Sequence, residues 1–306
     1  MAERRLGVSI PTEEGLGAVP ELVRLAERLG YTDAWSAEVN GSDAFTPLAA
    51  AAAVTESIRL GTAIVPVFTR PPGVVAMQAA SLSELSGGRF VLGLGCSTRV
   101  VVEQWFGVPF AKPLSRTREV TLQVRSLLDG EKVGGLRLAS PPSFPVPIWL
   151  AALGEEMLKL AAEIADGVCF YMVGPRLLPA LLKAAGDPGE SFARINVVPG
   201  QGEGAAALAR RAVVSYALVP YYARVMTQQG FGEEIQAIHE RWQTGDRAGA
   251  PGQVSDAMLD ELILTGTPDR IREGIERYWA AGLTTPTLAV FGGGDTSRLL
   301  QELAPG

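Results

Sequence analysis

Short apolar runs alternate with amphipathic segments along almost the whole chain. Residues 90–92 (Phe-Val-Leu) form a continuous apolar run, as expected of a strand that is buried on both faces. Residues 19–29 instead place Leu22, Leu25 and Leu29 at helical spacing on one face. The pattern predicts an alternation of strands and helices. The predicted strands cover residues 6–10, 32–36, 58–65, 90–94, 148–151, 167–171, 194–198 and 287–290.

The order of these elements points to an α/β fold with parallel strands. Eight short strands joined through helices imply right-handed crossover connections. They close either into an open doubly wound sheet or into a (β/α)8 TIM barrel. The strand count, the even spacing and the length of 306 residues favour the barrel, and the first strand lacks the glycine fingerprint of a dinucleotide-binding half. Active sites of such barrels lie at the carboxyl ends of the strands.

We predict that residues 1–306 form a single barrel domain with two departures from regular alternation. Residues at about 130–147 contain four prolines and several glycines, which predicts an irregular excursion. Residues at about 203–263 read as a long helical insertion with breaks, placed between the seventh predicted strand and the helix that Thr267 and Pro268 open.

Glycines stand at the end of the fourth predicted strand. Gly93 and Gly95 remove side chains at its carboxyl end, so that a flat or bulky group can approach the backbone. The alternative is that both glycines only relieve crowding inside a barrel. From this stretch alone, the two interpretations stay open.

Composition and charge exclude several classes of function. The 27 basic and 33 acidic side chains give a net charge of −6 with no basic run, so we expect no nucleic-acid binding. No apolar stretch is long and uncharged enough to cross a bilayer, so we expect no membrane partner. Cys96 and Cys169 lie in apolar surroundings, which is typical of a cytoplasmic protein without disulfides.

The predicted strand ends are poor in acid–base groups. His239 is the one histidine, and no second ligand lies at metal-binding spacing, so we expect no metal site. Hydrolysis by paired carboxylates needs two acids, and Glu38 has only the distant Glu103 as a partner. An apolar, glycine-rich site of this kind suits a large flat cofactor that carries the reaction itself.

Residues 151–154 (Ala-Ala-Leu-Gly) connect a predicted strand to a predicted helix. Backbone amides at this helix start are candidates for holding a phosphate group. Ordinary close packing of helix on strand explains the small residues equally well.

Several segments resemble the bacterial luciferase-like monooxygenase superfamily, and within it the branch that uses the deazaflavin coenzyme F420. The run Leu-Ser-Gly-Gly-Arg-Phe at 85–90 is the most specific of them. The similarity extends over nearly the whole chain in the right order. The segments that carry it are residues 43–50, 58–62, 82–95, 105–110, 161–167, 266–271 and 281–284.

The resemblance implies a (β/α)8 barrel, usually a homodimer, that holds a deazaflavin or flavin at the strand carboxyl ends. It also implies a non-proline cis peptide at the end of the third strand, where this chain reads 64–66; alternatively, Pro66 itself takes a cis bond. The family's cofactor contacts fall here on Glu38, Ile64, Val65, Gly93, Gly95, Ser97, Ala151, Ala152 and Gly154.

The chain departs from the family pattern at two places. Many relatives have an acid–histidine pair after the tryptophan of the second strand, and here Glu38 is followed by Val39. Proton transfer through that histidine is therefore not available to this chain. The excursion at 130–147 is also shorter than in many relatives, which suggests a more open pocket.

The leading hypothesis is an oxidoreductase that transfers a hydride between coenzyme F420 and a small organic substrate. Glu38 is the candidate catalytic residue, and Glu38, Asn40 and Ser97 are candidates for polar contacts to the cofactor ring. Arg99, Trp105 and Phe106 are candidates for the substrate pocket, although core packing explains the two aromatic residues nearly as well.

Two alternatives stay open. One is an FMN-dependent monooxygenase of the luciferase-like type that works with a separate reductase. The other is a barrel that has lost catalysis and only binds a flavin-like ligand or a partner.

Overall fold

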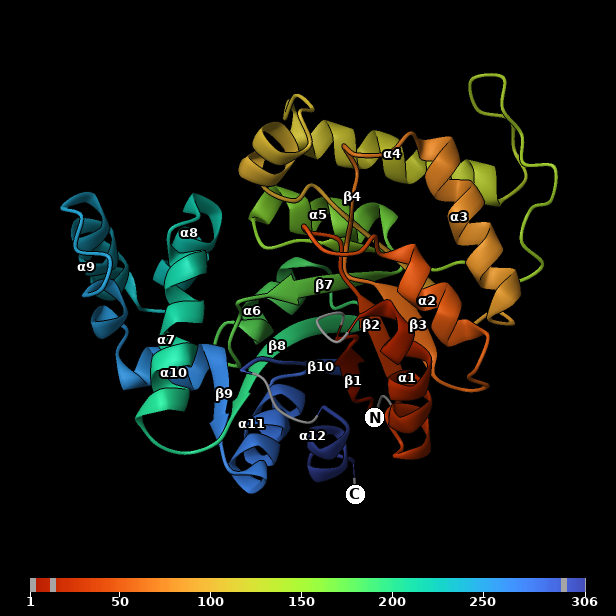
Figure 1. Cartoon of the computed structure of the whole chain (residues 1–306). Helices are drawn as coiled ribbons and strands as arrows, with labels where there is room; N and C mark the ends of the chain where they lie inside the picture. The colour runs from red at the N-terminus through yellow and green to blue at the C-terminus, as the bar shows by residue number, and fades with distance from the viewer. Residues whose placement is uncertain (1–3, 12–14, 293–295, 306) are drawn as a thin grey trace.

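The computed structural model describes residues 4–11, 15–292 and 296–305, and its centre is a closed barrel of eight parallel strands (Figure 1). Each strand pairs with the next, and the last pairs with both its predecessor and the first. This confirms the predicted (β/α)8 fold. In barrel order the strands are β1 (Gly7–Ser9), β2 (Asp33–Ser36), β3 (Arg59–Thr62), β5 (Phe90–Gly95), β6 (Ile148–Ala151), β7 (Gly167–Tyr171), β8 (Ser191–Pro199) and β10 (Thr285–Val290).

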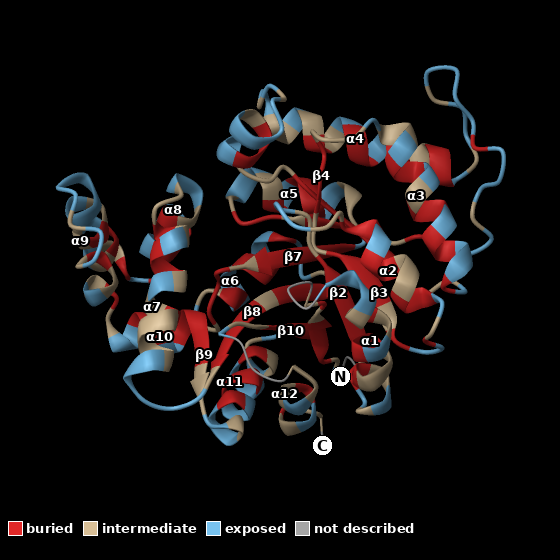
Figure 2. Ribbon diagram, in the orientation of Figure 1, coloured by how far each residue is buried: buried red, intermediate tan, exposed pale blue. Residues whose placement is uncertain are grey.

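Helices cover the outside of the barrel, and the strands between them are almost wholly buried (Figure 2). Outward-facing strand residues such as Leu60, Leu92 and Leu150 pack under these helices in one large apolar cluster. The covering helices are α1 (Val19–Arg28), α2 (Phe45–Ala52), α3 (Pro72–Leu85), α4 (Pro113–Leu128), α5 (Glu155–Ile164), α6 (Leu178–Ala184), α11 (Pro268–Ala280) and α12 (Thr296–Glu302). No helix of the described ranges has both the length and the apolar character that a membrane crossing requires.

The third predicted strand is broken near its end. β3 stops at Thr62, the peptide bond between Ala63 and Ile64 is cis, and the two-residue strand β4 (Val65–Pro66) then pairs with the end of β5. The prediction of one continuous strand over 58–65 was therefore wrong. A non-proline cis peptide is present as the resemblance implied, but it lies one residue before the predicted position and does not involve Pro66.

The seventh predicted strand, which is β8 in the structure, is longer than predicted. β8 starts at Ser191 rather than at residue 194, and only its first half pairs with β7. Its second half projects beyond β7, and β9 (Ile263–Gly266) pairs with the edge left free there. The prediction missed β9, because its four residues directly continue a helix.

Four helices connect β8 to β9 and lie to one side of the barrel in Figure 1: α7 (Glu203–Ala217), α8 (Pro220–Gln228), α9 (Gly232–Gln243) and α10 (Asp256–Leu262). They enclose a second apolar cluster, which includes Val213, Met226, Ile238 and Met258. Between α4 and β6, the only regular pairing in the described chain is a bridge between Val133 and Leu136.

Three aromatic rings fill the lower half of the barrel interior and form what we call the aromatic floor: Trp35, Trp149 and Phe192. The ring of Trp35 lies 5.1 Å from that of Trp149 and 4.6 Å from that of Phe192, centroid to centroid. A Cβ atom at Gly61 would lie 2.2 Å from the Trp35 ring, so glycine at this strand position makes room for the indole.

An ion-pair network lies directly below the aromatic floor. The Asp33 carboxylate is fully buried and pairs with both Arg5 and Arg59. The Arg59 guanidinium also lies 4.8 Å from the centroid of the Trp149 ring and pairs with Glu190 at 3.1 Å. Paired charges therefore close the amino-terminal end of the barrel.

Replacement of Asp33 tests this network. Asp33→Asn removes the charge that two partly buried guanidinium groups share, and we expect it to lower the free energy of unfolding by about 3–5 kcal/mol. Glu276→Gln is the control, because Glu276 pairs with Arg4 at an exposed site, where a pair contributes at most about 1 kcal/mol. Urea unfolding of the three proteins measures the difference. Equal losses in the two variants would contradict a stabilising role for the buried network.

Candidate functional site

The inner wall at the carboxyl ends of the strands has an apolar half on β3, β5 and β6. Ala63, Ile64, Gly95 and Ala151 meet there, and we call these four residues the apolar shelf. A Cβ atom at Gly95 would lie 3.0 Å from both Ile64 Cγ1 and Ala151 Cβ. The shelf is therefore a surface of small and aliphatic groups, of the kind on which a planar ring can rest.

Gly93 lies one inward position below Gly95 and has a different neighbour. A Cβ atom at Gly93 would lie 1.9 Å from the carbonyl oxygen of Thr62. The Gly93 amide also donates to Thr62 Oγ1 at 2.8 Å, and this hydroxyl donates to the Gly93 carbonyl at 2.9 Å. Close approach of two strands thus explains Gly93, whereas Gly95 belongs to the shelf.

The facing half of the wall is polar and aromatic. Tyr171 on β7 hydrogen-bonds the buried amide of Asn196 on β8, with 3.1 Å between Asn196 Nδ2 and the Tyr171 hydroxyl. Tyr216 on α7 and Tyr222 on α8 pack edge-on against the Tyr171 ring, at centroid distances of 4.8 and 5.8 Å. We call Tyr171, Tyr216 and Tyr222 the tyrosine wall.

Burial makes ionisation of Tyr171 and Tyr222 still less favourable than in water. It raises the pKa of Tyr171 well above the ordinary 10.0, and the neighbouring Tyr216 raises it further. Burial raises the pKa of Tyr222 in the same direction. Both side chains are therefore neutral phenols near pH 7, able to donate a hydrogen bond but not to act as bases.

Glu38, the predicted catalytic residue, is engaged in the loop that follows β2. Its carboxylate pairs with Arg70 and accepts a hydrogen bond from the Ala44 amide at 3.2 Å. Only 8% of its side chain is exposed. Asn40, two residues further on, is exposed. Glu38 thus ties the start of α2 to the segment before α3, both at the rim of the barrel.

Apart from Glu38, Asn40 and Gly93, which are described above, the predicted cofactor residues fall into two groups. Ile64, Gly95 and Ala151 form part of the shelf. The others surround it at the strand ends: Val65, which is buried and pairs with Leu94; Ser97, which has a left-handed φ of 60°; Ala152, whose amide donates to the Cys169 carbonyl; and Gly154.

Gly154 begins α5, and its amide is the predicted phosphate ligand. In the structure this amide donates to the Tyr221 hydroxyl at 2.7 Å. The amide therefore points at a polar group that α8 supplies. An oxygen of a ligand could take the place of that hydroxyl only if the Tyr221 side chain turned away.

Arg99, Trp105 and Phe106 lie at the outer rim, on and beside a π-helical turn (Val100–Trp105) that follows β5. Trp105 is 52% exposed and Phe106 43% exposed, which does not fit core packing. The Arg99 guanidinium pairs with Glu103 at 2.6 Å. These three residues are thus available at the entrance and do not line the inner wall.

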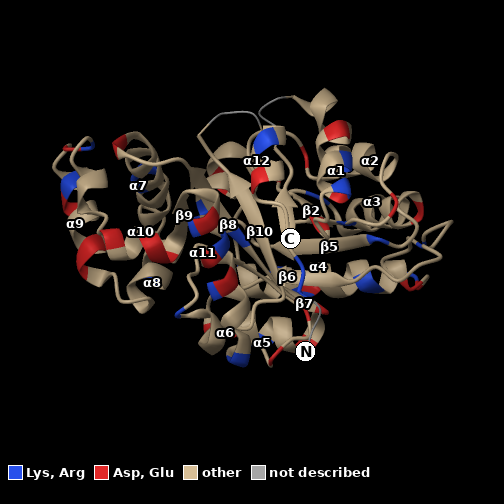
Figure 3. Ribbon diagram, turned by 90° about the horizontal axis from the view of Figure 1, so that it is seen from below, with Lys and Arg blue, Asp and Glu red and all other residues tan. Residues whose placement is uncertain are grey.

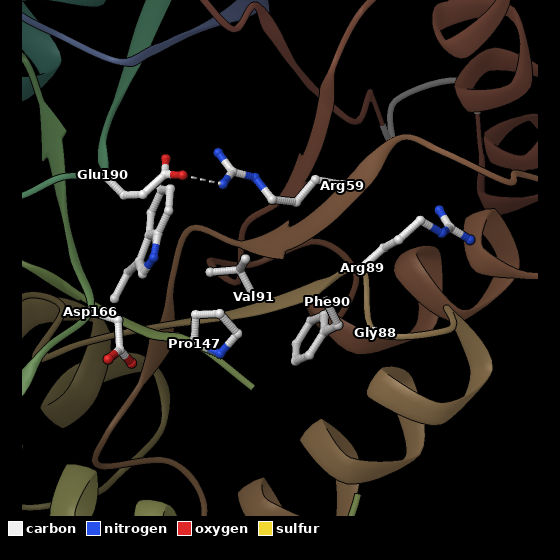
Figure 4. A pocket seen from close by; sticks show the side chains of 9 residues that line it. Arg59, Gly88, Arg89, Phe90, Val91, Pro147, Asp166 and Glu190 are labelled. Atoms are coloured by element: carbon white, nitrogen blue, oxygen red, sulfur yellow. Dashed lines mark hydrogen bonds and ion pairs between the residues drawn. The ribbon is translucent and has the colours of Figure 1, made fainter. Parts of the chain in front are cut away.

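A pocket of about 370 Å³ lies at the opposite end of the barrel, below the aromatic floor (Figure 4). Its charged groups have partners within the protein, since Arg59 pairs with Glu190 and Arg89 donates to the carbonyl groups of Thr55, Ser86 and Ile58. The amino-terminal face of such a barrel typically serves stability. We therefore place the candidate site at the carboxyl ends.

The electrostatic surroundings give no sign of another kind of site. Seen from below in Figure 3, acidic and basic residues are intermingled along the helices. The described residues include no cluster of three or more metal-ligating side chains.

Residues that the sequence analysis did not select complete the inner wall: Tyr171, Arg194, Asn196, Tyr216 and Tyr222. One signal was present for two of them. Arg194 and Asn196 are polar residues at alternate positions of an otherwise apolar strand, and such residues point to the same side. The tyrosines of α7 and α8 had no comparable signal, because their approach to the barrel depends on how the helices fold back.

Comparisons with known proteins show which family and fold this chain shares. Residues 1–285 match the family model described as luciferase-like monooxygenase. A Mycobacterium tuberculosis protein named "putative coenzyme F420-dependent oxidoreductase" is 32% identical over 86% of this chain and 88% of its own length. A 5,10-methylenetetrahydromethanopterin reductase of Archaeoglobus fulgidus is 30% identical over 86% of each chain.

A solved structure gives the same fold. The coenzyme F420-dependent tetrahydromethanopterin reductase of Methanopyrus kandleri superposes with a TM-score of 0.80 over 99% of this chain and 98% of its own, at 24% sequence identity.

The rim beside Glu38 makes a prediction about pH. Burial acts to raise the pKa of Asp43, but hydrogen bonds from Thr46 and Phe45 outweigh it and hold the pKa below the ordinary 3.8. A lowered pKa in the folded state means that the ionised carboxylate stabilises the protein above about pH 4, and that this contribution disappears as the pH falls further.

We therefore expect Asp43→Asn to lower the melting temperature at pH 7 and to flatten its fall below about pH 4. Asp269→Asn is the control, because Asp269 is likewise an acidic residue at the start of a helix, in the first turn of α11, but its side chain is 89% exposed. Melting curves from pH 3 to pH 7 measure the effect. Parallel curves for the wild type and Asp43→Asn would refute it.

Proposed function

We propose that this chain, which belongs to the luciferase-like monooxygenase family, is an oxidoreductase that transfers a hydride between coenzyme F420 and a small organic substrate. The apolar shelf is the observation that carries the proposal. It offers a flat contact surface at the carboxyl ends of the strands and no group that competes for protons. The similarity to relatives named for F420 supports the deazaflavin over other flat cofactors.

The residues present fit a planar cofactor. Gly95 is bordered by Ile64 and Ala151, and because it has no side chain, no group projects from the shelf between them. A ring placed there would contact these three residues. Ser97 lies two residues beyond Gly95 and is our candidate for a polar contact at the ring edge. When bound, the deazaflavin supplies the carbon that accepts or releases the hydride. The protein orients the reactants and excludes water.

Glu38 and Asn40 keep their proposed places beside the cofactor. Because Glu38 pairs with Arg70, proton exchange at this carboxylate would have to compete with the ion pair. We therefore propose that Glu38 acts first by holding the loop before α2 against the ring. Asn40 is exposed at the same rim and free to turn toward a bound ligand.

The phosphate end of the cofactor is proposed to bind at the start of α5. The Gly154 amide lies there next to the positive end of the helix dipole. Binding would displace the Tyr221 hydroxyl from the Gly154 amide. The homodimer, the single-domain organisation and the cytoplasmic location stay predictions.

A parallel titration tests the choice of cofactor. We expect oxidised F420 to bind the apo-protein at least tenfold more tightly than FMN, a difference of about 1.4 kcal/mol. Cofactor fluorescence gives the affinities, and the melting temperature rises with a ligand that binds the folded state. Preference for FMN would favour the monooxygenase alternative. Binding of neither would favour a barrel that has left redox chemistry.

A change on the shelf tests the location of the ring. Gly95→Ala adds a methyl group 3.0 Å from Ile64 and Ala151, and we expect about tenfold weaker F420 binding. Gly189→Ala is the control, since a Cβ atom there meets nothing within 4 Å. Both affinities are measured on variants whose melting temperatures show that they fold. Unchanged F420 binding by folded Gly95→Ala would remove the shelf from the proposed site.

A further inference from the structure

Arg194 places a guanidinium group inside the barrel, above the aromatic floor. On β8, residues at alternate positions face the interior, so Arg194 lies one inward position above Phe192 of the floor. Its register partners are Tyr171 on β7 and Thr287 on β10. The guanidinium carbon lies 5.4 Å from the Tyr171 ring centroid and 5.6 Å from that of Phe291.

This cation has no anionic partner in the described part of the chain. The Nε atom of Arg194 is buried and donates to no acceptor there, and no described carboxylate forms an ion pair with the side chain. Arginines near the rim differ, because Arg70 pairs with Glu38 and Arg99 pairs with Glu103. Buried polar groups without a partner are rare in folded proteins, and each one calls for an explanation.

A second polar atom next to Arg194 is also without a partner. Thr287 Oγ1 is fully buried and has no hydrogen-bond partner among the described residues. Thr287 is in register with Arg194 on the paired strand, but its hydroxyl lies toward Gly7 of β1, where an added Cβ atom would meet Thr287 Oγ1 at 2.4 Å. The Thr287 hydroxyl is thus packed against β1, and the donor that remains for a ligand above the aromatic floor is the Arg194 guanidinium.

The chemistry of the Arg194 guanidinium favours a planar anion such as a carboxylate. A guanidinium group stays charged at any physiological pH, and its donors match the two oxygens of a carboxylate. The rings of Tyr171 and Phe291 limit the orientation of the guanidinium plane, which selects for shape as well as charge. Tyr171 and Tyr222, as neutral phenols, add no negative charge that would repel the ligand.

The barrel order separates this group from the apolar shelf. Between β3 and β8 lie β5, β6 and β7 on one side and β10, β1 and β2 on the other. Arg194 therefore faces Ile64 of the shelf across the barrel, whereas Ala151, the shelf residue on β6, is two strands away from it. We infer that Arg194 binds a carboxylate group of the substrate, so that the substrate is a small organic acid. The assignment of this anion to a substrate rests on the proposed function.

Benzoate and benzamide are matched probes for this site, because they differ in charge and hardly in shape. We expect wild-type protein to bind benzoate at least tenfold more tightly than benzamide in calorimetric titrations at roughly millimolar concentrations. Arg194→Met should lose this preference, and Arg194→Lys should keep part of it, since a lysine retains the charge without the planar fork. Arg118→Met, which removes an exposed arginine paired with Glu163, is the control and should bind benzoate as the wild type does.

Two further readouts separate anion binding from other roles. Arg194→Met should fold with an unchanged or higher melting temperature, because it removes a half-buried charge whose buried Nε atom has no partner among the described residues. Its affinity for F420 should also equal that of the wild type. Tenfold weaker F420 binding with an intact benzoate preference would assign Arg194 to the cofactor and overturn the inference.

Other outcomes also overturn it. Equal binding of benzoate and benzamide by the wild type, or no benzoate binding at all, would exclude a carboxylate site. The same holds if Arg194→Met keeps the full preference for benzoate. Because the titrations are run both with and without F420, a protein that fails to bind F420 contradicts the proposed function while the benzoate result still decides the role of Arg194.

Discussion

The aromatic floor is the constraint on which the rest of the barrel depends. Trp35, Trp149 and Phe192 occupy the interior up to the middle of the strands, and glycines on neighbouring strands make room for the two indoles. Below this layer, the buried carboxylate of Asp33 pairs with Arg5 and Arg59, which offsets the cost of burying its charge. The candidate site lies above the floor, so the packing of the core also sets the depth of that site.

Above the floor, the two halves of the wall come from different parts of the chain. The apolar shelf belongs to the first half of the barrel, where the cis peptide between Ala63 and Ile64 ends β3 beside β5. The tyrosine wall belongs to the second half and to helices α7 and α8. The insertion between β8 and β9 is therefore part of the site as well as of the fold. In the proposed function, a cofactor ring on the apolar shelf and a substrate next to the tyrosine wall would meet inside the barrel.

The sequence predicted some strands correctly and missed features of others. Continuous apolar runs such as residues 90–94 identified the barrel strands, because burial on both faces leaves this pattern in any surroundings. The break of the third strand after Thr62 was not visible in the same way, since residues 58–65 have the composition of one uninterrupted strand. β9 was missed because its position depends on the free edge of β8, which other segments create.

The sequence by itself determined the alternation of elements, the barrel and the family, because periodicity and local motifs are properties of neighbouring residues. It also marked the carboxyl ends of the strands as the place for a site. Only the tertiary structure decided which polar groups are already paired there. Glu38 is paired with Arg70, whereas Arg194, in the middle of an apolar strand, has no ion-pair partner among the described residues. Pairing joins residues far apart in the chain, so it depends on how the strands close and cannot be read from their order.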